Sequence, residues 1–65
     1  MGDNVKFEVA LEVISMYISI AIANNDMELA ERLKKEKKEM YLGNNKLVEK
    51  VIDEYGKKIK DNLGV

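Results

Sequence analysis

The chain contains no cysteine, histidine, proline or tryptophan, and only one phenylalanine. Without cysteine it can form no disulfide, and without cysteine and histidine the common structural zinc sites are excluded. The lack of proline and the scarcity of glycine favour helices joined by short connections. We therefore expect a helical protein that uses no cofactor and no metal.

With 65 residues the chain predicts a single domain over residues 1–65, near the size at which one hydrophobic core is only marginally stabilising. Its formal net charge of −1 conceals an uneven distribution. Residues 1–31 carry one lysine against six acidic residues, whereas residues 32–65 carry ten basic residues against six acidic ones. Because the chain is this small and can form neither a disulfide nor a common zinc site, good helix packing or self-association must stabilise it.

Residues 5–23 hold most of the apolar bulk of the chain. Their first part alternates between apolar and polar residues, as in the ribbon of a ribbon-helix-helix dimer. No turn residue follows until Asn24, however, and a strand of that length would be about three times the usual one. Read as a helix, the polar residues share one stripe. The members of this stripe are Glu8, Glu12, Ser15 and Ser19.

Outside this stripe the predicted helix is apolar over an arc of about 260°, against roughly 100° for an ordinary surface helix. Two short helices of the same chain cover only part of such an arc, so we expect a homodimer or a higher homo-oligomer. One flank of the arc consists of Val9, Val13, Met16 and Ile20. We assign the oligomer or partner interface to the other side, with the first flank as the alternative. That interface consists of Phe7, Leu11, Ile14, Tyr17, Ile18 and Ile22.

Two further helices are predicted, over residues 26–42 and 45–62. Asp3 or Asn4 is expected to cap the first helix, and Asn25 with Glu28 resembles a capping box for the second. Gly43 suits a left-handed C-terminal cap. The third helix is expected to run through Gly56. The fold class is therefore all-α, a three-helix domain with the apolar first helix at its centre.

Basic residues concentrate in residues 32–39, RLKKEKKE. The interleaved glutamates and the four-residue spacings between opposite charges are typical of a solvated helix face. A nucleic-acid contact is the less favoured interpretation, because nucleic-acid-binding domains are usually strongly basic overall. Its candidate residues are Arg32, Lys34, Lys35, Lys37 and Lys38.

Enzymatic activity is not expected. The pair Glu8 and Glu12 offers carboxylates on one helix face, but acid–base work needs a pocket that separates their pKa values. A membrane-inserted peptide is a third alternative, which rests on the uncharged residues 13–23. This run is shorter than the roughly 20 residues that span a bilayer, and acidic residues precede it, unlike a signal peptide. We expect a cytoplasmic protein without a membrane partner.

The run NNDMELAERLKKEKKEMYLGN, followed by VEKVIDEYG, resembles short helical proteins encoded by phages and mobile elements of Gram-positive bacteria. The resemblance implies a class of task, namely binding a host protein and changing its activity, and it carries over no functional residue. The expected function is a protein-interaction module that binds itself and a further, unidentified protein. The alternative is a small dimeric transcriptional regulator that binds nucleic acid.

Overall fold

A computed structural model describes residues 2–62 of the chain. The first helix, α1, spans Gly2–Ala23, and the second, α2, spans Met27–Tyr41. The third helical segment begins as an α-helix, widens into a five-residue π-helical turn and continues as an α-helix. Its parts are α3 (Asn45–Lys50), η1 (Val51–Tyr55) and α4 (Gly56–Asn62).

The all-α three-helix fold is confirmed. The helix of residues 5–23 is confirmed as well, and the ribbon alternative is wrong because no strand occurs within residues 2–62. The third segment stays helical through Gly56, as expected. Gly56 has ordinary helical dihedrals, and no atom lies near the place where a Cβ would sit. Close approach of another backbone within the chain is therefore not the reason for this glycine.

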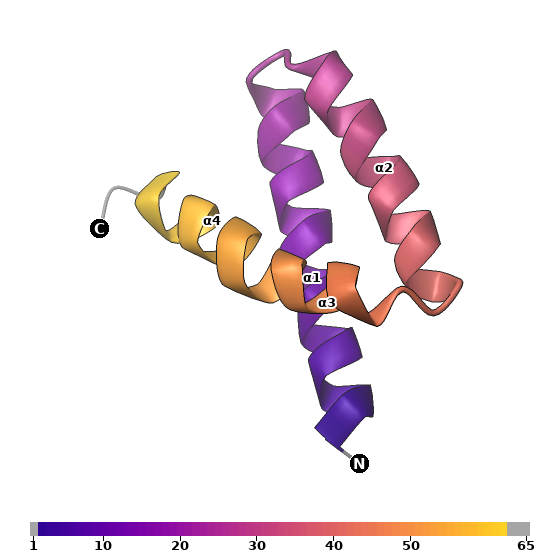
Figure 1. The fold of residues 1–65 in the computed structure, drawn as a ribbon. Coiled ribbons are helices and arrows are strands. Elements are labelled where there is room, and N and C mark those ends of the chain that lie inside the picture. Colours follow the sequence, from indigo (N-terminus) through magenta and orange to yellow (C-terminus); the bar gives the residue numbers. More distant parts are fainter. Residues whose placement is uncertain (1, 63–65) are drawn as a thin grey trace.

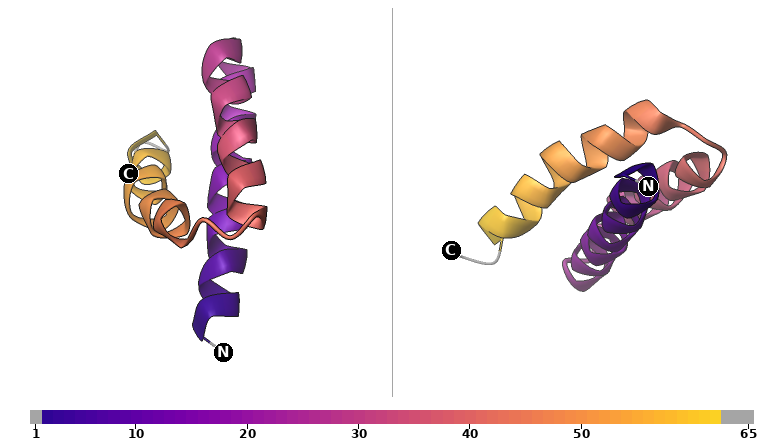
Figure 2. Two further views of the ribbon diagram at one scale, coloured as in Figure 1. Left: turned by 45° about the vertical axis from the view of Figure 1, so that its right-hand side comes forward. Right: turned by 90° about the horizontal axis from the view of Figure 1, so that it is seen from below.

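The helices α1 and α2 run antiparallel and form a hairpin (Figure 1). The third helical segment crosses α1 steeply and lies against one face of this hairpin, which the two views of Figure 2 show. The resulting molecule is flat, with Cα extents of 35 × 26 × 14 Å. A flat shape has much surface for its volume, so α1 is covered on some sides and open on others.

The N-cap of α2 lies one residue later than the predicted capping box. Asn25 adopts a left-handed conformation with φ of 61°, which asparagine tolerates better than most residues. Asp26 is the N-cap instead, and its Oδ1 accepts a hydrogen bond from the Leu29 backbone N–H at 3.2 Å. The prediction of Asn25 as the cap is therefore wrong by one residue, because the chain uses Asn25 to make the turn.

The other helix ends follow the sequence signals in part. Gly43 has φ of +100°, the left-handed conformation that its position after α2 predicts. Asn44 caps α3 by accepting a hydrogen bond from the Leu47 N–H at 3.2 Å. The predicted cap of the first helix is corrected, because α1 already begins at Gly2 and includes Asp3 and Asn4.

The core gathers apolar side chains from all three helical segments. Three of its members are alanines, whose small side chains let helices approach closely. Ile14, Leu33, Met40 and Val51 are the largest side chains that solvent does not reach. The core residues are Ala10, Ile14, Ala21, Ala30, Leu33, Met40, Val48, Val51, Tyr55 and Ile59. The first helix is thus held by contacts on two sides, toward α2 and toward the third helical segment.

Candidate interaction surfaces

An apolar strip on α1 remains open to solvent. Met16 keeps 52% of its surface exposed and Val9 keeps 41%, while Val13 and Ile20 beside them are half-buried. The strip has the four–three spacing with which one helix packs along another. We call it the α1 seam, and it consists of Val9, Val13, Met16, Ile20 and Ala23. Apart from Ala23, it is the flank that the sequence indicates as the alternative contact.

The flank that was assigned to the interface is largely used inside the chain. Ile14 is fully buried in the core, and Phe7 packs edge-to-face on Tyr41 with the ring centroids 5.5 Å apart. The ring of Tyr17 likewise packs edge-to-face on that of Tyr55, with the ring centroids 5.1 Å apart. Leu11 and Ile18 are half-buried against the core, and only Ile22, 45% exposed, stays open. The expectation that this flank is left uncovered is corrected, because α2 and the third helical segment cover it.

The five basic residues of the predicted nucleic-acid contact do not form one surface. Lys34, Lys37 and Lys38 line a hollow of about 450 Å³ between α1 and α2. Arg32 and Lys35 instead line a separate hollow that also involves Lys58 of α4. Three acidic residues line this second hollow, so its charges are mixed. The α-helical period places residues two apart on different sides of α2, which divides the cluster.

The first of these hollows is called the lysine groove below. Besides its three lysines, Ser15 and Ile18 of α1 and Tyr41 of α2 line it. Tyr41 is 62% exposed, although its place on the apolar stripe predicts a core or interface position. The lining residues thus combine three positive charges, an exposed aromatic ring and an apolar side chain, and they include no carboxylate.

Lys37 is the member of the groove held most firmly. Its side chain is half-buried, and its Nζ donates a hydrogen bond to Ser15 Oγ at 3.0 Å. The aliphatic stem therefore lies along the hairpin, as expected for a lysine that interrupts an apolar stripe. Because Ser15 is neutral, this hydrogen bond brings the ammonium group no negative charge.

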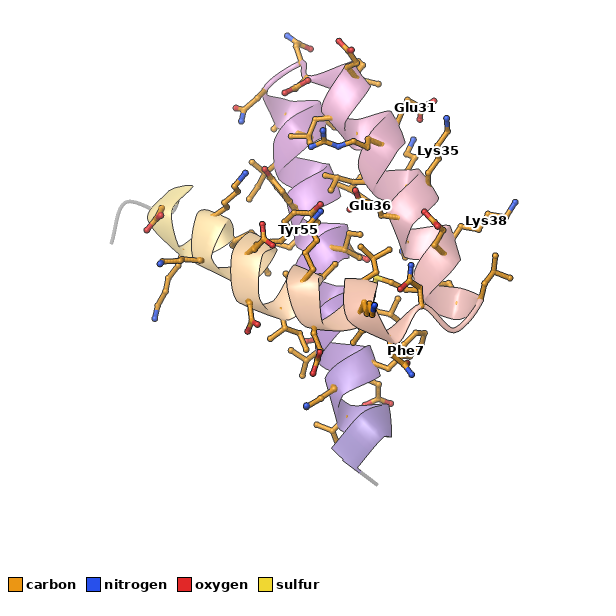
Figure 3. All side chains as sticks on the ribbon, in the orientation of Figure 1. Phe7, Glu31, Lys35, Glu36, Lys38 and Tyr55 are labelled. Atoms are coloured by element: carbon orange, nitrogen blue, oxygen red, sulfur yellow. The ribbon has the colours of Figure 1, made fainter. Side chains whose placement is uncertain are left out.

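A buried phenol joins the three helical segments. Tyr55 Oη donates a hydrogen bond to Glu36 Oε1 at 2.6 Å, and Figure 3 shows the Tyr55 side chain directed toward Glu36 of α2. Burial of the ring raises the pKa of the Tyr55 phenol well above its usual value near 10, and the hydrogen bond to Glu36 and the charge of that carboxylate raise it further. Lys50 Nζ lies 5.8 Å from the centre of the same ring.

The paired carboxylates considered for catalysis, Glu8 and Glu12, both lie exposed on α1. Neither is in an enclosed pocket of the kind that acid–base chemistry needs. Within the described part of the chain, no group of three or more acidic side chains is arranged to hold a metal ion. Over the same residues, no helix has both the length and the apolarity to cross a bilayer.

The sequence pointed to the three lysines of the groove among five basic candidates, but it did not predict the groove itself. Lys34, Lys37, Lys38 and Tyr41 recur at three- and four-residue spacing and so share a side of a helix. The contribution of Ser15 and Ile18 could not be read in this way, because it depends on how α1 packs beside α2.

The chain matches no protein-family model, and no curated protein or solved structure is significantly similar to it.

Proposed function

We propose that this chain is a non-enzymatic protein-interaction module that self-associates through the α1 seam and binds a further protein. One observation carries the proposal, namely that an apolar strip with the spacing of a helix–helix contact lies open on the longest helix. Burying such side chains against a partner would stabilise the complex by about 25 cal/mol for each Å² of apolar surface removed from water.

A second copy of the chain is the occupant that the seam favours. Val9, Val13, Met16 and Ile20 can interdigitate with the same residues of another α1, because a two-fold contact pairs a strip with itself. Val13 and Ile20 are seven residues apart and so are Val9 and Met16, which gives the two alternating positions that one helix presents to another in close packing. The seam reaches from Val9 to Ala23, about four helical turns.

The further partner is proposed to be a host protein, in keeping with the resemblance to short helical proteins of phages and mobile elements. A binding role agrees with a chain whose open surfaces are an apolar strip and a charged groove.

Solution mass tests the self-association. Light scattering or sedimentation of the unmodified chain should give a multiple of its 7.4 kDa mass. Met16→Asp places a charge in the middle of the seam and should yield a monomer, whereas Ile22→Asp, which charges the other flank, should leave the assembly intact. Circular dichroism verifies that both variants stay helical. A monomeric unmodified chain at high concentration would refute the proposal, and dissociation by Ile22→Asp alone would move the contact to the other flank.

A nucleic-acid-binding regulator is the second candidate, favoured by the grouping of Lys34, Lys37 and Lys38 next to the exposed Tyr41. It expects affinity for DNA or RNA that falls steeply with salt, because lysine–phosphate contacts release counterions. Arg32 and Lys35 lie outside this group, which reduces the number of phosphate contacts that one strand could make. Titration of a labelled oligonucleotide at low salt decides the matter, since no binding there excludes this candidate.

A further inference from the structure

We infer that the lysine groove is a docking site for an acidic protein segment that carries an apolar anchor residue. The inference rests on the proposed function, since it names the chemistry of the further protein partner. The groove lies between two antiparallel helices, a position in which a third, partner-derived segment can lie along both. Its lining determines what that segment must offer.

Charge is the first requirement. Lys34, Lys37 and Lys38 line the hollow, and no carboxylate lines it. Lys34 lies 3.6 Å from Glu31 on its own helix, a highly exposed pair that water screens. Lys37 and Lys38 form no ion pair with any side chain that the structure describes. Carboxylates of an incoming segment would complete these positions, above all at Lys37, whose ammonium group is held in place by its hydrogen bond to Ser15.

An apolar contact is the second requirement. Ile18 and the ring of Tyr41 both line the groove, and this ring is mostly exposed although its edge contact with Phe7 fixes its place. Exposed tyrosines next to apolar side chains are typical centres of protein interfaces, because they bury a large area at little entropic cost. A leucine or a similar residue of the partner would fill this position.

The charge of the whole chain favours a peptide over nucleic acid. Twelve acidic residues exceed the eleven basic ones, so the molecule does not attract a polyanion from a distance. A short acidic segment needs only local complementarity, which three lysines in one hollow supply. Lys38 lies at the outer edge of the groove, because its side chain projects from the side of α2 that is turned away from α1 (Figure 3).

The test uses a fluorescein-labelled peptide in which two leucines four residues apart are flanked by glutamates. We expect it to bind the full chain, to bind more weakly as salt increases, and to lose about tenfold in affinity to the variant Lys37→Gln/Lys38→Gln. The matched control, Lys57→Gln/Lys60→Gln, removes the same charge from α4 and should change the affinity less than about twofold.

Three outcomes would overturn the inference. One is equal binding of a peptide with glutamine in place of every glutamate, and another is an equal loss in the α4 control. The third is tighter binding of a single-stranded oligonucleotide of the same charge, which would assign the groove to nucleic acid.

Sedimentation of the same variants separates this test from that of the proposed function. Met16→Asp should be monomeric and still bind the peptide. Lys37→Gln/Lys38→Gln should bind the peptide more weakly and still self-associate. A groove variant that falls apart into monomers would instead make the groove a contact between copies and contradict the docking site.

Discussion

At the scale of single residues, Tyr55 links the third helical segment to the hairpin of α1 and α2. Its ring is only 4% exposed, packs edge-to-face on Tyr17 of α1 and donates a hydrogen bond to Glu36 of α2. One side chain thus contacts both helices of the hairpin. Since a hydrogen bond to a charged group contributes about 1.5–3 kcal/mol, less when its acceptor is partly hydrated, Tyr55→Phe should lower the free energy of unfolding by about 1–2 kcal/mol.

The pH dependence of stability follows from the same phenol. Folding raises the pKa of Tyr55, so the unfolded chain releases this proton first as the pH increases. The contribution is therefore complete below the ordinary tyrosine pKa near 10 and is lost progressively at higher pH. Urea unfolding between pH 8 and 11 should show a steeper loss of stability for the unmodified chain than for Tyr55→Phe.

The control for this comparison is Tyr41→Phe, which removes a mostly exposed hydroxyl and leaves every other titrating group in place. It should follow the unmodified chain across the whole pH range. Parallel curves for the unmodified chain and Tyr55→Phe would mean that Tyr55 ionises in the folded protein as it does in water.

At the scale of elements, the third helical segment is notable for its π-helical turn. Such turns are rare and often lie beside functional residues. Here the turn ends at Tyr55, directly before Gly56. Gly56 weakens an otherwise regular amphipathic helix, because glycine costs about 1 kcal/mol relative to alanine inside a helix.

Gly56→Ala should therefore stabilise the protein by about 0.5–1 kcal/mol. The dihedrals at Gly56 are helical and no atom lies within 4 Å of an added Cβ, so alanine fits without strain. Thermal unfolding followed by circular dichroism measures the change. The paired variant Gly43→Ala should destabilise the protein, because φ of +100° strains a residue that has a side chain. Destabilisation by Gly56→Ala would indicate that the helix must open at this point.

At the scale of the whole molecule, a flat arrangement of three helical segments buries a small core and leaves the α1 seam open. If the seam binds a second copy, the midpoint of thermal unfolding should rise with protein concentration, by a few degrees for each tenfold increase. It should reach a constant value at low concentration, because Ile14, Leu33 and Val51 form a core within one chain.

Met16→Asp should show that constant value at every concentration, since it removes the association and leaves the core untouched. Differential scanning fluorimetry or calorimetry over a hundredfold range of concentration makes the measurement. A midpoint that is independent of concentration in the unmodified chain would contradict self-association through the seam.

The sequence by itself determined the helices and two of their ends, at Gly43 after α2 and at Asn44 before α3. Apolar periodicity, Gly43 and Asn44 act within a few residues, so their effects can be read from neighbouring positions. The turn between α1 and α2 shows the limit of such reading. Asn25 and Asp26 are both good N-cap residues, and Asp26 caps α2 because the backbone at Asn25 takes the left-handed conformation of the turn.

Only the tertiary structure decided which surfaces stay open. A helical wheel shows that Val9 and Met16 share one flank and Ile14 lies on another, but the direction in which the third helical segment crosses α1 determines which flank is buried. The packing of α2 beside α1 likewise placed Lys37 against Ser15. The physical reason is that local propensity acts along the chain, whereas burial depends on contacts between residues far apart in the sequence.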